Sequence, residues 1–148
     1  MRVILPTVLL IAAIANAESH ISLEEAEEFF ELYQEMGKNF DPEIADLYSD
    51  EANISTLRTY PWGTKKLREM DGKQYKVIIK SVLPLAKDKG DISTFTDIEI
   101  TVEKSVAKIS AKRFSETKQY MDEGYYMVLE KSSEGEISII EEHTNTKP

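Results

Sequence analysis

Hydrophobic and polar positions alternate at helical spacing just after residue 20. Apolar side chains recur there every three or four residues, and glutamates occupy the positions between them. Ser22 and Glu25 have the spacing of a capping box, and Gly37 is a typical helix end. The pattern predicts an amphipathic helix over residues 22–37 with an aromatic buried face. Its apolar positions are Leu23, Ala26, Phe29, Phe30, Tyr33 and Met36.

Two further helices are predicted in the first half of the chain. Asp41 can cap a short helix, and Pro42 suits its first turn. A third helix should follow Gly72, because its apolar residues have the spacing i, i+3, i+4 and i+7, and Pro84 should end it. The apolar positions of this third helix are Tyr75, Ile78, Ile79 and Val82.

Other segments alternate with the period of strands. Residues 52–60 and 65–70 predict a hairpin that turns at residues 61–63. The second half predicts an antiparallel sheet, and the tail from His143 should be frayed. The strands predicted in that half are 97–103, 107–113, 125–131 and 136–141. Because helices come first and a meander of strands second, the pattern predicts an α+β domain.

The first residues have the pattern of an export signal. Arg2 precedes an apolar run from Val3 to Ala15, and Ala15-Asn16-Ala17 is a small-x-small cleavage site. The run is shorter than the about 20 residues that a spanning helix needs. We therefore expect a signal peptide over 1–17, cleavage after Ala17, and one periplasmic or secreted domain over 18–148 with no membrane span.

Charge and composition exclude several classes of partner. The chain has 27 acidic and 18 basic residues and a formal net charge of −9, which disfavours nucleic acid as a partner. It has no cysteine, which excludes disulfides and thiol chemistry. Basic residues concentrate in 64–90, and acidic residues in 22–36 and 122–142. We interpret these runs as a solvated surface on which the charges compensate one another.

Three segments carry a resemblance to a known family. Residues 40–52, 72–84 and 125–142 resemble the second helix with the first strand, the third helix and the closing hairpin of the nuclear transport factor 2-like superfamily. That superfamily includes ketosteroid isomerases and polyketide cyclases. The resemblance implies three N-terminal helices packed on a strongly curved antiparallel sheet that forms a cone, with a ligand pocket at its open end.

The isomerase chemistry of that superfamily finds little support in this sequence. It requires a general base on the first strand and acidic donors for an oxyanion. By the resemblance, Tyr33 falls near a donor position, and the second donor position falls on Tyr126 or Met127. The base position falls on Thr56 or Leu57, neither of which can accept a proton usefully.

Other catalytic sets are equally unsupported. The only histidines are His20 and His143, near the two ends of the mature chain, so we expect no metal site and no nucleophilic triad. The glutamates of the first helix should face solvent. No cofactor is expected, and no catalytic residue is identified.

Two arginines and several aromatic residues are candidates for a pocket. Arg113 should project toward the open end of the cone, and Arg58 lies next to Tyr60 and Trp62. Either guanidinium could bind a ligand carboxylate, or it could pack its stem on the sheet and pair with a glutamate. The aromatic residues could equally be ordinary core. The pocket candidates are Tyr33, Arg58, Trp62, Tyr75, Arg113 and Tyr126.

The sequence therefore favours an exported, non-catalytic domain that binds a small apolar or amphipathic molecule in its cone. Two alternatives stay open. One is an enzyme that uses a tyrosine or a carboxylate in the same pocket. The other is a protein-interaction domain that acts as a homodimer through its sheet.

Overall fold

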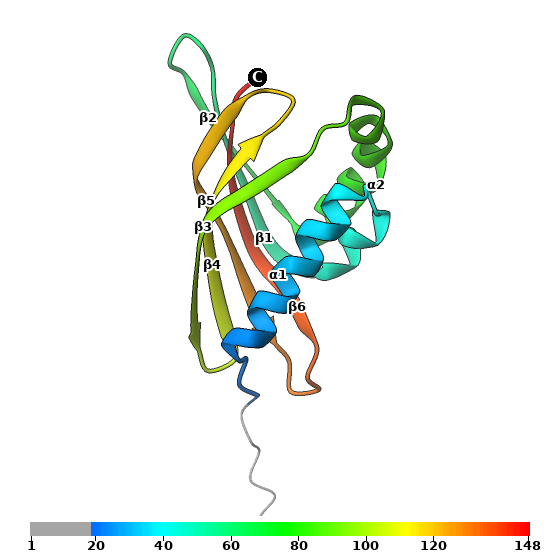
Figure 1. The fold of residues 1–148 in the computed structure, drawn as a ribbon, viewed down its shortest axis with the longest axis vertical. Helices are drawn as coiled ribbons and strands as arrows, with labels where there is room; N and C mark the ends of the chain where they lie inside the picture. Colours follow the sequence, from blue (N-terminus) through cyan, green and yellow to red (C-terminus); the bar gives the residue numbers. More distant parts are fainter. Residues whose placement is uncertain (1–18) are drawn as a thin grey trace, which may run out of the picture.

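The computed structural model describes residues 19–148, and the predicted signal peptide, residues 1–17, lies outside the described residues. Its helices are α1 (Leu23–Lys38), the short 3-10 helix η1 (Pro42–Leu47) and α2 (Gly72–Lys89). Its strands are β1 (Tyr48–Thr59), β2 (Lys65–Asp71), β3 (Ser93–Glu103), β4 (Val106–Ser115), β5 (Tyr120–Lys131) and β6 (Ile137–Thr146) (Figure 1). None of the described helices is long and apolar enough to cross a membrane.

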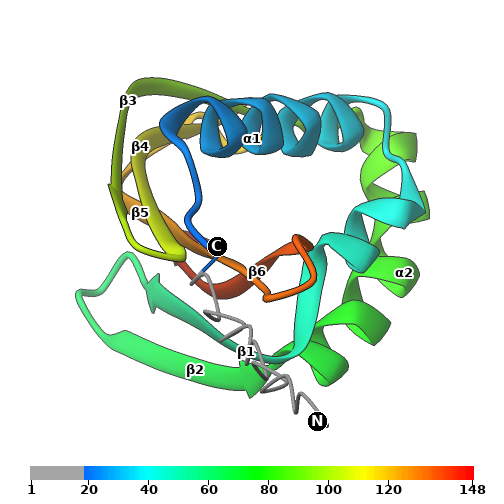
Figure 2. The same cartoon turned by 90° about the horizontal axis from the view of Figure 1, so that it is seen from below.

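The strands form one curved six-stranded sheet in the order β2-β1-β6-β5-β4-β3. Its concave side faces α1 and α2, so that sheet and helices together surround the interior (Figure 2). We call this concave side the inner face. The β1–β2 hairpin projects beyond the rest of the sheet at the top of Figure 1.

The α+β fold with a curved sheet is confirmed, but two details of the prediction are wrong. The helices are not all N-terminal, because β1 and β2 precede α2. The sheet is not wholly antiparallel, because β1 and β6, next to the edge strand β2, pair in parallel. A parallel pair needs a long connection, and the chain from β2 to β5 supplies it.

Both long helices begin at capping boxes. At the start of α1, Ser22 Oγ accepts from the Glu25 backbone N–H at 3.0 Å, and Glu25 Oε1 accepts from the Ser22 N–H at 3.1 Å. Asp71 and Gln74 form the same motif at the start of α2. The predicted end of α2 at Pro84 is wrong. A proline removes a single N–H donor, and the helix continues until Gly90, whose backbone is left-handed with φ 62°.

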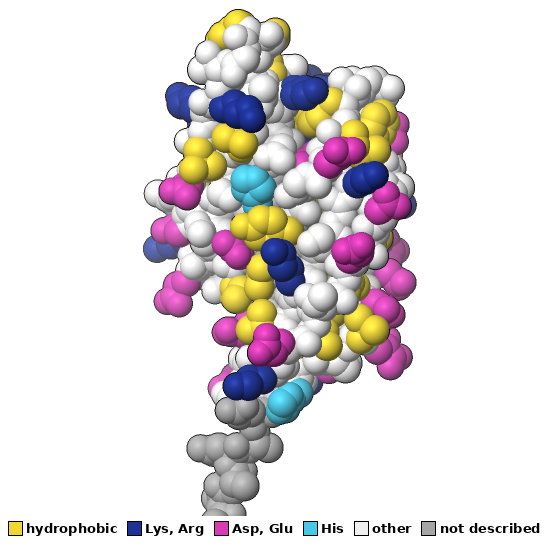
Figure 3. All heavy atoms as spheres, turned by 90° about the vertical axis from the view of Figure 1, so that its left-hand side faces the viewer, with side chains coloured by type: hydrophobic (Ala, Val, Ile, Leu, Met, Phe, Trp, Pro, Cys, Tyr) yellow, Lys and Arg dark blue, Asp and Glu magenta, His cyan; other side chains and the backbone are white. Residues whose placement is uncertain are grey.

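The C-terminal residues are also better ordered than the sequence suggests. His143 to Thr146 belong to β6 and pair with β1, where Ser55 faces His143 and Arg58 faces Thr146. The His143 ring stacks on Tyr126 with 5.5 Å between centroids. The predicted fraying of this tail is wrong, because the parallel partner strand extends to Thr59. On this outer face of the sheet, acidic, basic and hydrophobic side chains are mixed (Figure 3).

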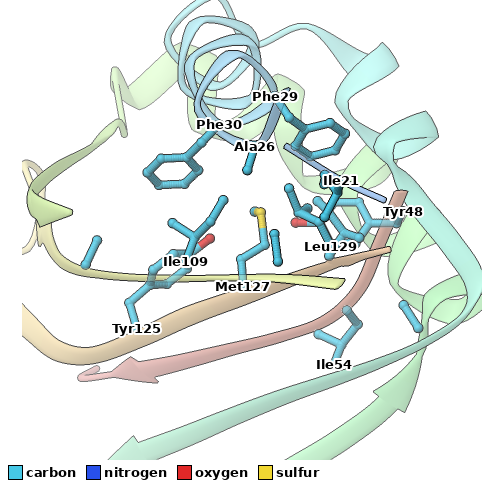
Figure 4. Packing of buried hydrophobic residues seen from close by; sticks show 14 residues of the cluster. Ile21, Ala26, Phe29, Phe30, Tyr48, Ile54, Ile109, Tyr125, Met127 and Leu129 are labelled. Carbon is cyan, nitrogen blue, oxygen red and sulfur yellow. The ribbon is translucent and has the colours of Figure 1, made fainter. Parts of the chain in front are cut away.

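The core lies between α1 and the inner face of the sheet. Ala26, Phe29 and Phe30 of α1 point toward side chains of β4 and β5 (Figure 4). Phe95 of β3 meets the Phe30 ring edge-on at 5.1 Å. The side chains that this packing buries almost completely include Phe30, Ile109, Tyr125, Met127, Leu129 and Ile139.

A matched pair of glycine substitutions tests the junction between α2 and β1. A Cβ on Gly72 would overlap the backbone carbonyl oxygen of Ser49, whereas a Cβ on Gly37 would meet only Ile44 at 4.0 Å. We expect Gly72→Ala to lower the free energy of unfolding by about 3 kcal/mol, because backbone must move. Gly37→Ala should leave it unchanged or raise it by up to about 1 kcal/mol.

Urea unfolding of both variants measures the difference. Equal stability of Gly72→Ala and Gly37→Ala would contradict the close approach of α2 to β1.

Candidate functional site

An irregularity in β6 turns a carboxylate into the interior. Leu129 of β5 faces Ile139 of β6, but Val128 faces Glu141, so β6 has one extra residue at this point. Such a bulge reverses the side of the sheet on which the following residues lie. Glu142, rather than Glu141, therefore points inward, and it is only 1% exposed.

Three tyrosine hydroxyls donate hydrogen bonds to this carboxylate. Tyr48 Oη donates to Glu142 Oε1 at 2.6 Å. Tyr125 Oη and Tyr33 Oη donate to Oε2 at 2.6 Å and 3.0 Å. We call these four residues the Glu142 cluster. Its members come from β6, β1, β5 and α1, so one carboxylate joins the long helix to three strands.

Aromatic packing fixes the position of each hydroxyl. The Tyr33 ring is stacked with Phe30 of the same helix at 5.8 Å. Tyr48 meets Tyr75 of α2 edge-on at 5.2 Å, and Tyr125 meets Phe95 at 5.0 Å. Because this packing already fixes the three tyrosine rings, their hydroxyls can point at Glu142 with little additional loss of side-chain conformational entropy.

Burial dominates the protonation of the cluster. It raises the pKa of Glu142 above the usual value of a glutamate, although the three phenols and the charge of Arg113 oppose this shift. Burial and the nearby Glu142 charge raise the pKa of Tyr33, Tyr48 and Tyr125 well above 10.0. The tyrosines therefore stay protonated as donors, and Glu142 is the group that can exchange a proton.

A second polar group, Arg113 of β4, lies beside the cluster. Its Nη1 donates to Ser93 Oγ at 3.2 Å, and its Nη2 donates to Tyr120 Oη and to the Asn145 carbonyl. Its Nε is 3.5 Å from Asp122, a carboxylate that is 2% exposed. One hydrogen of Nη1 remains for a ligand, since a guanidinium carries five N–H donors.

These groups line a cavity of about 230 Å³ between α1, the end of α2 and the inner face. We call it the inner cavity. Both apolar and polar side chains line it. The apolar side chains include Phe40, Ile44, Leu83, Ile92 and Phe95, and the polar ones include Tyr33, Gln34, Tyr75, Ser93, Arg113, Tyr125, Glu142 and Thr144.

The structure brings together three of the predicted pocket residues, Tyr33, Tyr75 and Arg113, in the inner cavity. Arg58 lines a different cavity, which also touches Tyr75. Trp62 is 73% exposed at the tip of the hairpin, where it stacks on the half-buried ring of Tyr60.

Tyr126 lies on the outer face, because its neighbour Tyr125 occupies the inner one. There Lys108 Nζ is 4.7 Å from the centroid of the Tyr126 ring.

Sequence reasoning missed the two buried acids, Glu142 and Asp122. Both belong to the acidic run that we interpreted as solvated surface, and for these two residues that interpretation is wrong. Their burial depends on hydrogen-bond partners that are distant in the chain. A clue was present in the pair Glu141-Glu142, because adjacent residues of a strand point to opposite faces.

No group of three or more histidine, aspartate or glutamate side chains within residues 19–148 is placed to hold an ion.

The pH dependence of stability tests the raised pKa of Glu142. Between pH 4.5 and the raised value, the folded protein keeps a proton that the unfolded chain releases. The free energy of unfolding therefore falls as pH rises through this window, by up to about 1.4 kcal/mol per pH unit. Glu142→Gln removes this dependence, so wild type should lose stability relative to this variant from pH 4.5 upward.

Denaturant unfolding from pH 4 to 8 measures the difference, with Glu141→Gln on the outer face as the control for loss of one acid. If the advantage of wild type over Glu142→Gln grows with pH instead, the tyrosines outweigh burial and the assignment is wrong.

Comparison with known proteins supports the architecture alone. No protein-family model matches the chain, and a search of curated proteins finds no match. Among solved structures, a nuclear transport factor 2-like protein of unknown function from Pseudomonas putida KT2440 is similar, with TM-score 0.64 and 11% identity over 82% of this chain and 84% of that one.

Two further neighbours are named for activities. A candidate ketosteroid isomerase from Parabacteroides distasonis ATCC 8503 has TM-score 0.55 and 15% identity over 82% of this chain and 85% of that one. A candidate dehydratase from Streptomyces avermitilis has TM-score 0.58 and 12% identity over 82% and 93%. The resemblance predicted from the sequence is confirmed: the chain has the nuclear transport factor 2-like fold.

Proposed function

We propose that the protein is exported and binds a small amphipathic molecule in the inner cavity. The observation that carries this proposal is the mixed wall, which combines aromatic and aliphatic side chains with Arg113, Glu142, Tyr33 and Tyr125. Pockets for small molecules typically combine apolar walls with a few convergent polar groups. A purely apolar ligand, which the sequence left open, would make no use of the hydrogen-bonding capacity that these polar groups still have.

The size of the cavity limits the ligand. A cavity of about 150 Å³ in another protein holds one benzene molecule. The inner cavity, at about 230 Å³, therefore suits a single ring with one or two substituents. A sterol or other fused-ring skeleton would be too large without movement of α1 or α2.

The polar wall specifies where the substituents should lie. The tyrosine hydroxyls donate their hydrogens to Glu142. Their oxygens and the carboxylate are therefore available to a ligand only as hydrogen-bond acceptors. Arg113 Nη1 presents a donor. The matching ligand carries a hydroxyl or amino group at one end and a carbonyl at the other.

Export is the second part of the proposal. It is supported by the pattern of the first residues, in which Arg2 is followed by an apolar run and then by the small-x-small site Ala15-Asn16-Ala17. The ligand would then be met in the periplasm or outside the cell. N-terminal sequencing of the mature protein tests this part, and it should begin at Glu18.

A matched pair of probes tests ligand binding. We expect 4-hydroxyacetophenone to bind and acetophenone to bind at least about tenfold more weakly, since the second probe lacks the hydroxyl that would donate to the oxygens of the Glu142 cluster. In Leu83→Trp the larger side chain should occupy the cavity and abolish binding. Val82→Trp, the next residue of α2 and 48% exposed, should leave it unchanged.

Calorimetric titration measures the affinities. Equal binding of both probes, or binding that survives Leu83→Trp, would contradict the proposed site.

Glu142 also favours a second candidate function, proton transfer. In its ionised form, a buried carboxyl with a raised pKa at the wall of a cavity can take a proton from carbon and return it, while the Arg113 guanidinium stabilises the oxyanion. This function requires a second orientation of 4-hydroxyacetophenone, in which the acetyl group lies between Glu142 and Arg113. In D₂O the methyl protons of the probe bound in that orientation would then exchange. Proton NMR should show exchange with wild type and none with Glu142→Gln. Equal rates in both would leave binding as the only function.

A further inference from the structure

A second cavity, of about 240 Å³, lies between the β1–β2 hairpin and α2. It shares only Tyr75 with the inner cavity. We call it the basic cavity. Its lining residues are Thr56, Arg58, Tyr60, Lys66, Arg68, Met70, Tyr75, Ile78 and Thr146.

The register of the hairpin concentrates positive charge in this cavity. Arg58 of β1 faces Lys66 of β2, and Thr56 faces Arg68. Residues directly opposite or two apart share one face of a sheet, so the three cations stand side by side. Like charges in this arrangement repel one another, which is a cost that a bound anion would remove.

None of the three cations is neutralised by the described part of the chain. No carboxylate lines the basic cavity. The ion pairs of residues 19–148 involve Lys76, Lys112, Arg113 and Lys131, and none involves Arg58, Lys66 or Arg68. In a chain with 27 acidic residues, three basic side chains without a carboxylate partner at one cavity are an unexpected arrangement.

Arg58 carries the clearest sign of a missing partner. Its Nε is buried, and no described residue accepts a hydrogen bond from it. Its guanidinium lies over the Tyr60 ring, 5.6 Å from the centroid. This cation–π contact involves the flat face of the guanidinium and leaves the N–H groups along its edge without an acceptor. A buried donor without an acceptor costs about 1 to 3 kcal/mol. A carboxylate or phosphate oxygen that packs against the edge of this guanidinium would supply the missing acceptor.

The remainder of the wall is apolar and comes mainly from Met70, Tyr75 and Ile78. We propose that the basic cavity is a second binding site, which takes a small organic anion. Arg58, Lys66 and Arg68 hold its carboxylate or phosphate group, and the apolar side chains hold its body. This site stands independently of the inner cavity, because the two linings have opposite polar chemistry.

Phenyl phosphate, which joins a ring to a dianion, is the first probe. We expect saturable binding measured by calorimetry, and amide shifts of ¹⁵N-labelled protein confined to β1, β2, the first half of α2 and the end of β6. Phenol and inorganic phosphate should each bind at least about tenfold more weakly, because each lacks half of the ligand. Phenylacetate tests whether a carboxylate serves as well as a phosphate.

Variants separate the basic cavity from general attraction to positive charge. Arg58→Met should weaken phenyl phosphate binding at least tenfold, and so should Lys66→Gln combined with Arg68→Gln. The double variant changes only exposed side chains and keeps the test valid if Arg58→Met fails to fold. The control is Lys65→Gln, which removes the same charge one residue away, where Lys65 pairs with Thr59 outside the cavity lining.

Three results would overturn the proposal. The first is an equal loss of affinity in Lys65→Gln. The second is an affinity for inorganic phosphate equal to that for phenyl phosphate. The third is a set of amide shifts centred on the Glu142 cluster.

Discussion

The burial of one carboxylate is the interaction on which the rest of this structure depends. A carboxyl group removed from water is costly unless hydrogen bonds replace its hydration. Glu142 obtains three, from tyrosines that belong to α1, β1 and β5. The requirement to satisfy this group ties α1, β1 and β5 to β6. It also keeps the adjoining space polar, so that the interior ends in a cavity and not in a closed core.

The inner cavity and the basic cavity, which share Tyr75, offer opposite hydrogen-bonding groups to a ligand. The inner cavity offers acceptor oxygens from the Glu142 cluster and one guanidinium that is already paired with Asp122. The basic cavity offers three cations without a carboxylate partner among the described residues. Tyr75 lines both and separates them, while its ring packs on Tyr48. This arrangement supports a binding protein with two sites of different preference more directly than the single apolar pocket expected from the sequence.

Much of the fold was accessible from local patterns. The capping box at Ser22, the aromatic face of α1 and the hairpin about Pro61 are each set by neighbouring residues. The site depends on features of another kind. The extra residue in β6 reverses the alternation of inward and outward side chains beyond Ile139. The sequence pattern does not reveal this reversal, and Glu142 was therefore assigned to the surface. The grouping of Arg58 with Lys66 and Arg68 arises from hairpin register, and Tyr126 faces outward because Tyr125 faces in. Such pairings are long-range, and single-strand patterns do not contain them.

The most direct test of this account is an NMR titration of the Glu142 carboxyl carbon in ¹³C-labelled protein, assigned by the resonance that disappears in Glu142→Gln. Because burial outweighs the three tyrosine hydrogen bonds, the account predicts a midpoint clearly above 4.5, the ordinary value of a glutamate. A midpoint at or below 4.5 would contradict it, since Glu142 would then be a fixed anion held by its tyrosines and could not act as the exchangeable centre of the inner cavity.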